Sequence, residues 1–170
     1  MTLDCGVATV RHWRRADKES LLRFANDRSV WRNLTHTFPH PYTEADAEAW
    51  FALLDSAGEP THWAVEVEGV AAGGVGVTLH AGIHCKSGEF GYWLGAPYWR
   101  RGIMTEVVRA VSRFAMERYG LMRLESPVFA WNPASMRVLE KSGFVREGIL
   151  RKSAYKDGQV IDTVMYALIA

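Results

Sequence analysis

The sequence predicts a mixed α+β protein with one twisted, mostly antiparallel sheet, a central parallel pair of strands and helices on both faces of the sheet. Residues 61–69 alternate well between apolar and polar side chains and residues 6–13 do so loosely, which is typical of strands. Residues 88–131 follow the order strand, long helix, strand, and a right-handed crossover of this kind makes the two strands parallel neighbours. The chain closes with two strand-like segments around Lys156-Asp157-Gly158, a turn sequence typical of antiparallel hairpins.

The predicted strands are bounded by turn residues, and only some of them show the alternating pattern. They cover residues 6–13, 61–69, 70–81, 88–97 and 121–131, followed by the two strands within 144–169. A corner at Glu68 and Gly69 joins the second and third of them into a hairpin. Beyond that corner, Gly73, Gly74 and Gly76 predict a bulge or a close approach of another part of the backbone.

The predicted helices repeat apolar residues at helical spacing and carry end signals. They cover residues 17–30, 44–58, 102–120 and 132–143. Thr43 followed by Asp46 resembles a capping box, and Asn132 is a suitable N-cap because Pro133 follows it at the first helical position. The stretch 33–43 is irregular, since its two prolines would break a helix.

Length and charge narrow the class of protein. A chain of 170 residues predicts a single domain over residues 1–170. The net charge of +1 argues against a nucleic-acid partner, because phosphate binding favours a strong basic excess. No apolar run approaches the ~18 residues of a membrane span, and the first residues show no signal peptide. Cys5 and Cys85 show no pairing pattern, so we expect a soluble protein of the reducing cytoplasm with no membrane partner.

Arg100, Arg101 and Gly102 stand between a predicted strand and the longest predicted helix. The first amides of a helix lack internal acceptors, and the helix dipole leaves partial positive charge there. Gly102 lets a ligand approach the backbone where a Cβ would collide, so the arrangement suits a diphosphate. A plain helix entry with two solvated arginines explains the same residues.

Two longer segments carry a resemblance to a known family. The patterns GEFGYWLGAPYWRRGIMTEVVRAVSRFA and FAWNPASMRVLEKSGFVREGILR resemble the GCN5-related N-acetyltransferases (the GNAT superfamily), and within them the ribosomal-protein N-acetyltransferases of the RimJ/RimL type. The resemblance implies the GNAT fold and the transfer of an acetyl group from acetyl-CoA to a primary amine, on a protein N-terminus or a small molecule, with no metal. A non-catalytic acyl-CoA sensor or interaction module of the same fold is the alternative, and an acyl donor longer than acetyl is a third reading. Relatives often dimerise, so a homodimer is also to be tested.

For the cofactor, the resemblance implies that WRRGIM (99–104) is the acetyl-CoA signature, although three of its residues depart from the usual ones. It places the pantetheine arm along FGYWL (90–94), a strand splayed from RLESPVFA (123–130). The residues implied in cofactor binding are Phe90, Gly91, Tyr92, Trp93, Leu94, Trp99, Arg100, Arg101, Gly102, Ile103, Met104, Thr105, Asn132 and Ser135. Core packing is the alternative for the aromatic residues of the strand.

For catalysis, the resemblance implies Glu89 as the base, acting directly or through water, since an amine with a pKa of about 8 to 10 is mostly protonated at neutral pH. It implies that the Ser135 hydroxyl assists the departing thiolate. The alternatives are an edge charge for Glu89, a surface hydroxyl for Ser135 and a plain helix cap for Asn132. Some relatives carry a second acidic residue in the last hairpin, where this chain has Ala154.

For the acceptor, the resemblance implies a groove bordered by WRNLTHTFPHPYT (31–43). The residues expected to line it are Trp31, Asn33, His36 and Tyr42, with loop packing as the alternative for each. The stretch is not strongly acidic, which argues against a polyamine acceptor. His80, His84 and Cys85 lie close in sequence, but no fourth ligand and no helical spacing support a metal site there.

Overall fold

The computed structural model describes the whole chain, residues Met1–Ala170. It contains two compact units: unit 1 comprises Met1–Gly76 and Tyr92–Ile103, and unit 2 comprises Val77–Gly91 and Met104–Ala170. None of its helices combines the length and the hydrophobicity that a membrane span requires.

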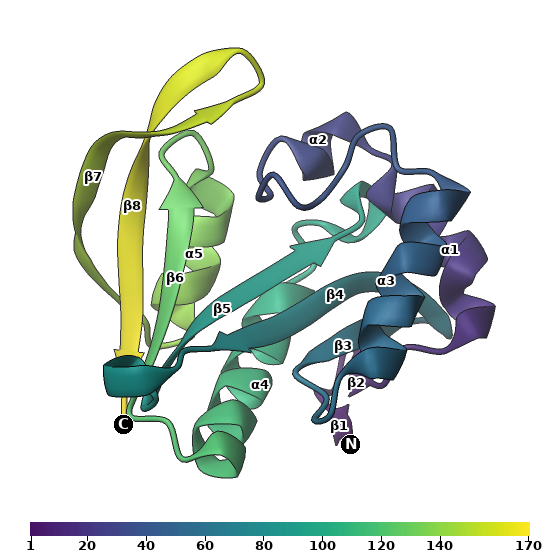
Figure 1. Cartoon of the computed structure of the whole chain (residues 1–170), viewed down its shortest axis with the longest axis horizontal. Coiled ribbons are helices and arrows are strands. Elements are labelled where there is room, and N and C mark those ends of the chain that lie inside the picture. Colours follow the sequence, from purple (N-terminus) through teal and green to yellow (C-terminus); the bar gives the residue numbers. More distant parts are fainter. The chain divides into compact units, whose positions relative to one another are not determined.

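An eight-stranded sheet has the order β1-β2-β3-β4-β5-β6-β8-β7 (Figure 1). The strands are β1 (Thr2–Asp4), β2 (Thr9–Arg11), β3 (His62–Val67), β4 (Val70–Leu79), β5 (Ser87–Leu94), β6 (Arg123–Phe129), β7 (Val145–Lys156) and β8 (Gln159–Ile169). β5 and β6 pair in parallel, whereas β1–β2, β2–β3, β3–β4, β6–β8 and β7–β8 are antiparallel. The predicted fold class, with its central parallel pair, is confirmed.

The helices follow the predicted segments with one exception. They are α1 (Lys18–Ala25), α2 (Arg28–Trp31), α3 (Glu44–Ser56), α4 (Ile103–Tyr119) and α5 (Pro133–Lys141), with short 3-10 segments at Arg15–Asp17, Gly82–His84 and Ala96–Tyr98. The predicted caps are confirmed: the Thr43 hydroxyl accepts the Asp46 N–H at 3.3 Å, and Asn132 Oδ1 accepts the Ser135 N–H at 3.2 Å. These caps satisfy amides that the helix itself leaves without acceptors.

The exception is the segment 17–30, which was predicted as one helix and is two. Asn26 leaves helical geometry with φ −81° and ψ 47°, and its side-chain oxygen accepts the Tyr42 N–H at 3.1 Å. Asp27 then caps α2 by accepting the Ser29 N–H at 2.8 Å. The first helix therefore ends because Asn26 bonds to Tyr42 and because Asp27 caps a new helix. The spacing of apolar residues, on which the prediction depended, contains neither signal.

The first strand also differs from the prediction. The segment 6–13 was predicted as one strand, but its first residues belong to the turn of a hairpin in which β1 pairs with β2. Gly6 lies in that turn at a φ of 74°, a left-handed conformation that glycine adopts without a steric penalty.

The close backbone approach predicted for the glycines of β4 is confirmed. A Cβ at Gly73 would collide with the carbonyl oxygen of Trp93, and a Cβ at Gly76 would collide with the His62 ring. The hairpin before them turns at Glu68 and Gly69, which both have positive φ values, 54° and 80°.

Each unit packs apolar residues against the part of β5 that it contains. In unit 1, Trp93 packs against the apolar core that α1 and α3 share, formed by Leu21, Ala25, Tyr42, Ala47 and Phe51. In unit 2, the ring of Phe90 lies 5.9 Å from that of Phe144, which follows α5.

Both helices of unit 2 lie on the face that carries Phe90. The Tyr166 hydroxyl of β8 donates to Glu140 of α5 at 2.8 Å, and Arg109 of α4 donates to the Lys141 carbonyl at 2.8 Å. Figure 1 shows α5 beside β6. The opposite face of the unit 2 sheet has no helix of unit 2 over it.

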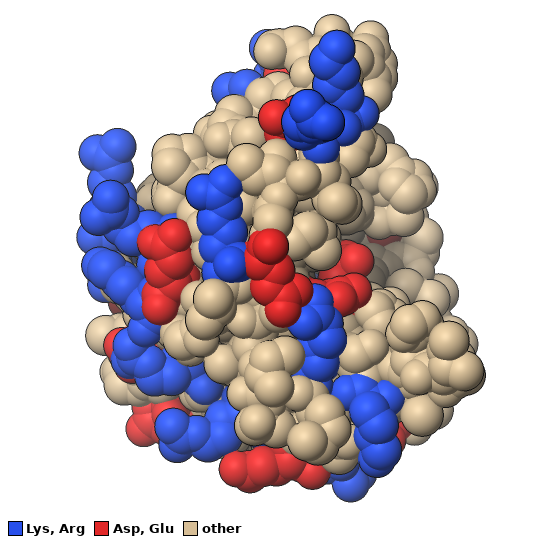
Figure 2. All heavy atoms as spheres, turned by 90° about the vertical axis from the view of Figure 1, so that its left-hand side faces the viewer, with Lys and Arg blue, Asp and Glu red and all other residues tan.

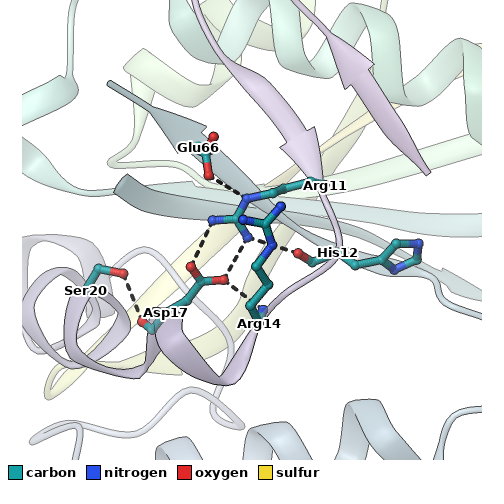
Figure 3. A network of polar contacts seen from close by, with 6 residues as sticks. All are labelled: Arg11, His12, Arg14, Asp17, Ser20 and Glu66. Atoms are coloured by element: carbon teal, nitrogen blue, oxygen red, sulfur yellow. Dashed lines mark hydrogen bonds and ion pairs between the residues drawn. The ribbon is translucent and has the colours of Figure 1, made fainter. Parts of the chain in front are cut away.

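A buried ion-pair network joins three elements of unit 1 (Figure 3). The Arg11 guanidinium of β2 donates to both oxygens of Asp17 at 2.8 Å and to Glu66 of β3 at 2.5 Å. Arg11 and Asp17 are only 5% and 7% exposed. The Arg14 N–H also donates to Asp17 at 2.8 Å. Burial opposes ionisation of Asp17, but its hydrogen bonds with Arg11 and Arg14 outweigh that effect and lower its pKa.

Candidate active site

The parallel ladder between β5 and β6 is short. It contains three pairs, Ser87–Arg123, Gly88–Leu124 and Glu89–Glu125. Further along, residues 126–129 of β6 keep their pairing with β8. The resemblance implied that these two strands splay, and in unit 2 the ladder register ends at Glu89 (Figure 1).

Glu89 occupies the last pair of this ladder. Its side chain is half-buried, and its carboxylate has no hydrogen-bond or ion-pair partner within the chain. Fully buried carboxylates are usually paired, because desolvating an unpaired charge costs free energy, whereas a half-buried one can stay unpaired at the edge of solvent. The oxygens of Glu89 are therefore available to an outside proton donor.

Glu125, which the sequence prediction missed, is the register neighbour of Glu89. Arg123 donates to Glu125 at 3.1 Å and forms a two-pronged pair with Glu147 at 2.7 and 2.8 Å. The hydrogen bond to Glu147 is the main cause that raises the pKa of Arg123, and Arg123 lowers the pKa of Glu147 in turn. Side chains alternate between the two faces of a strand, so residues 123 and 125 share a face. A prediction that had paired β6 with β5 in this register would have placed Glu125 beside Glu89.

Phe90 and Gly91 follow Glu89 on β5. Phe90 is 1% exposed, so its side chain belongs to the core of unit 2, as the packing alternative held. A Cβ added to Gly91 would meet no atom within 4 Å. Open space beside an exposed strand backbone suits an extended ligand arm.

The remaining cofactor residues on β5 belong to unit 1 and are well packed. Trp93 makes an edge contact with Phe38 at 5.6 Å, and Leu94 is 6% exposed. Tyr92 is half-buried. The Leu94 carbonyl accepts the indole N–H of Trp99 at 2.6 Å, which ties the turn after β5 back to the end of the strand.

The signature turn has an unusual backbone. Arg100 and Gly102 both have positive φ values, 62° and 76°, and α4 begins at the next residue, Ile103. Arg100 is exposed and has no partner in the chain. Arg101, by contrast, pairs with Glu68 at 2.5 Å and lies over the Tyr98 ring. Of the two arginines, Arg100 is the one with a free charge.

The first residues of α4 divide between core and surface. Ile103 and Met104 are 2% and 8% exposed, so their side chains serve packing and only their backbone is available to a ligand. Thr105 is half-buried, and its carbonyl accepts the Ser142 hydroxyl at 3.2 Å. Amides in a first helical turn have no intrahelical acceptor, which keeps them available to an anion.

Replacing Gly102 by valine tests the turn as a diphosphate cradle. A Cβ at Gly102 meets no protein atom, so added bulk would crowd only a ligand. We expect Gly102→Val to weaken CoA binding by roughly tenfold or more in calorimetry. Gly158→Val is the matched control, because Gly158 also has a φ of 76° and open space around it. Both variants should lose similar thermal stability through backbone strain; equal CoA dissociation constants in the two would contradict the cradle.

Asn132 and Ser135 lie at the start of α5 in unit 2. Asn132 caps the helix through the Ser135 N–H, so its capping role is established whatever else it binds. Ser135 is half-buried in the first turn of the helix. A role for either residue at the thioester stays a prediction.

The predicted acceptor residues are arranged in unit 1. Trp31 stacks on His40 with ring centroids 5.4 Å apart, and the Asn33 side chain donates to the Ser29 carbonyl at 2.9 Å. His36 is exposed. Tyr42 is 7% exposed in the core of unit 1, and burial raises its pKa to about 12. Packing accounts for Tyr42, whereas acceptor binding by these residues stays a prediction.

The cluster of His80, His84 and Cys85 forms no metal centre. His80 contacts the Ser87 hydroxyl at 3.0 Å, and Ser87 donates to the His84 carbonyl at 2.9 Å. No three His, Cys, Asp or Glu side chains anywhere in the chain lie close enough together to hold a metal ion.

Comparisons with known proteins bear on this arrangement. The family described as Acetyltransferase (GNAT) domain matches residues 8–145, which include parts of both units. The chain is 33% identical over 121 residues to the uncharacterized N-acetyltransferase YoaA of Bacillus subtilis (strain 168), covering 70% of this chain and 68% of YoaA.

Solved structures share the fold. RimL, a ribosomal L7/L12 alpha-N-protein acetyltransferase solved with coenzyme A, has a TM-score of 0.84 at 20% identity, covering 99% of this chain and 98% of RimL. Spermidine N-acetyltransferase from Vibrio cholerae, solved with CoA and spermine, has a TM-score of 0.81 at 20% identity, covering 96% of this chain and 95% of that one. The resemblance is confirmed, and the chain belongs to the GNAT family of acetyltransferases.

Proposed function

We propose that the chain transfers an acetyl group from acetyl-CoA to a primary amine, with Glu89 as the base. The observation that carries this proposal is the unpartnered carboxylate of Glu89 at the point where the parallel ladder ends. Because the family match includes parts of both units, we take residues 1–170 as one acetyltransferase domain.

The residues present fit a coenzyme A thioester. The turn at Arg100–Gly102 offers a free guanidinium and open space at Gly102, and Gly91 leaves open space beside β5. Both RimL and the spermidine enzyme were solved with CoA. When bound, acetyl-CoA supplies an acetyl group activated by its thioester.

The chain's own groups have three tasks in this reaction. Glu89 accepts the proton that the amine must lose before its nitrogen lone pair can attack. A backbone N–H of residues 90–94 donates to the oxygen on which negative charge develops. The Ser135 hydroxyl donates to the departing sulfur, which needs only modest help because a thiol has a pKa of about 8.5.

The alternative function, an acyl-CoA sensor without turnover, makes a different prediction for one experiment. The purified chain is mixed with acetyl-CoA and a panel of amines that includes N-terminal peptides, spermidine and small antibiotic amines. We expect thiol release that depends on the amine, and an acetylated product by mass spectrometry. Tight CoA binding without thiol release for every amine would favour the sensor, and faster release from bulkier thioesters would identify a longer acyl donor.

The Ser135 hydroxyl is tested separately. Ser135→Ala should lower kcat by roughly tenfold, because it removes a hydrogen bond to the thiolate and leaves the base intact. The helix cap should survive, since Asn132 bonds the backbone N–H of this residue. Ser135→Thr keeps the hydroxyl and should recover most of the rate; an alanine variant with full activity would assign Ser135 to the surface.

A further inference from the structure

Arg101 ties the signature turn to the hairpin between β3 and β4. Its guanidinium donates to a carboxylate oxygen of Glu68 at 2.5 Å and lies over the Tyr98 ring, 5.6 Å from the ring centroid. All of these residues belong to unit 1. Arg100 has no partner in the chain and Gly102 has no side chain, so Arg101 supplies the only side-chain anchor of the turn.

The segment just before the turn is fixed by several contacts. The Tyr98 N–H donates to the Gly95 carbonyl at 3.0 Å, and the Tyr98 ring makes an edge contact with the Phe24 ring at 5.5 Å. The indole N–H of Trp99 donates back to the end of β5. Beyond Trp99, the ion pair is the side-chain contact that holds the position of the turn.

Glu68 occupies a position that its own hairpin does not favour for glutamate. Val67 pairs with Val70, so Glu68 and Gly69 form a two-residue loop, and their φ values are 54° and 80°. A two-residue loop with two positive φ values favours Asn-Gly or Asp-Gly, because asparagine and aspartate tolerate the left-handed region better than glutamate does.

The last hairpin has the favoured residue in an equivalent loop. Lys156 pairs with Gln159, and the two residues between them, Asp157 and Gly158, have φ values of 51° and 76°. The two loops share their length and their φ values and differ in the first residue. A residue kept in an unfavourable conformation indicates a role outside its loop, and the contact that Glu68 makes is the ion pair with Arg101.

An ion pair alone does not mark a positioning contact. Arg151 and Lys152 of β7 are exposed as well, and Figure 2, which views the molecule from the side of β7, shows basic side chains interspersed with acidic ones. The side chains of Arg101 and Glu68 are themselves 46% and 64% exposed, and such pairs contribute little to stability. This pair differs because it joins a left-handed residue to a turn that contains two more.

We propose that Glu68 is a positioning residue for the cofactor: by pairing with Arg101 it fixes the signature turn in the conformation that receives the phosphates of CoA. This inference rests on the proposed function, in which the turn binds the diphosphate. The pair also keeps the Arg101 guanidinium occupied, so Arg100 is the arginine left for a phosphate. A turn that is already ordered lowers the cost of binding, and loss of the anchor weakens binding without removing a contact to CoA.

Calorimetric titration of CoA into two variants tests the role of Glu68. Glu68→Gln keeps the length of the side chain, and Glu68→Asn introduces the residue that the loop favours; both remove the charge. We expect both to raise the dissociation constant of CoA by roughly three- to fivefold, and by less at high salt because exposed pairs are screened. The Asn variant should unfold at a higher temperature than the Gln variant, so an equal loss of affinity in the two would not follow from stability.

A double-mutant cycle with Arg101→Gln distinguishes an anchor from a direct ligand. An anchor predicts that Arg101→Gln weakens CoA binding as much as Glu68→Gln does, and that the double variant is no worse than either single one. In turnover, the loss should raise KM for acetyl-CoA and leave kcat nearly unchanged. Tighter CoA binding by Glu68→Gln, or fully additive losses, would show that Arg101 contacts the phosphates itself and would overturn the proposal.

Two matched controls remove the same charges elsewhere. Asp157→Asn removes a carboxylate from the first position of the other two-residue loop, and Arg151→Gln removes an exposed guanidinium from β7. Both should keep the wild-type dissociation constant of CoA. Equal losses in Asp157→Asn and Glu68→Asn would assign the effect to net charge and overturn the positioning role.

The outcomes separate this inference from the function on which it rests. Calorimetry needs no turnover, so an unchanged CoA affinity in both Glu68 variants would overturn the positioning role and leave acetyl transfer in place. Absence of thiol release from a chain that binds CoA would overturn the proposed function, whereas weaker CoA binding by the Glu68 variants would still support the positioning role. A wild-type chain that binds no CoA would overturn both.

Discussion

Glu89→Gln should lower kcat at pH 7 by roughly 100-fold or more and leave the dissociation constant of CoA nearly unchanged. The substitution keeps the size of the side chain and removes its capacity to accept a proton. No partner in the chain depends on the carboxylate, so no internal contact is lost with it. The loss should shrink as the pH rises toward the pKa of the acceptor amine, because the amine then gives up its proton to solvent.

Steady-state rates across pH and calorimetric CoA titrations measure the two effects of this variant. Glu117→Gln is a suitable control, because Glu117 is an exposed carboxylate on α4 and its charge is lost in the same way. The control should retain wild-type rates. A Glu89→Gln chain that works within twofold of the wild type would remove Glu89 from the mechanism.

Asp17→Asn should destabilise the fold by about 3–5 kcal/mol, the largest stability effect that we expect from one substitution. It breaks the two-pronged pair with Arg11 and leaves Glu66 as the only carboxylate that pairs with the buried guanidinium. Both partners of the broken pair have side chains less than 10% exposed, at 6% and 9%, so water cannot replace the lost charge. Urea unfolding measures the difference in the free energy of unfolding.

The pH dependence gives this prediction a second readout. The pKa of Asp17 is lowered in the folded state, so its contribution is complete well above the ordinary aspartate value of about 3.9 and is lost as the pH falls through the lowered pKa. The gap between wild type and variant should therefore narrow in acid. Asp55→Asn is the matched control: it breaks the exposed pair with Arg15 and should cost less than about 1 kcal/mol. If Asp17→Asn and Asp55→Asn lost similar amounts of the free energy of unfolding, the ion pair of Asp17 with Arg11 would contribute no more than an exposed pair does.

Signals between residues close in sequence predicted much of the fold correctly. The Asn132 cap, the Thr43–Asp46 capping box and the hairpin turn at Asp157-Gly158 are all present. Each depends on the hydrogen bonds or φ values of a few adjacent residues, so the sequence states it directly. The order of strand, helix and strand likewise predicted the parallel pair, because the crossover has one favoured hand.

The candidate site depended on contacts that local patterns do not contain. Glu125 lies 36 positions after Glu89 along the chain and becomes its neighbour only through the register of β5 and β6. Arg100 and Arg101 are the same residue type, but Arg101 forms an ion pair with Glu68, which lies in a turn far away in the sequence. The sequence alone therefore could not show which of the two arginines keeps an unpaired charge.

The sequence by itself therefore determined the family, the order of the main helices and strands from α3 onward, the predicted caps and turns, and Glu89 as the candidate base. Only the tertiary structure decided which charges are paired and which remain free: Asp17 is held by Arg11, whereas Glu89, Arg151 and Lys152 have no partner. The physical reason is that caps and turns are set by neighbours along the chain, whereas ion pairing and burial are set by strand register and packing between residues far apart in it.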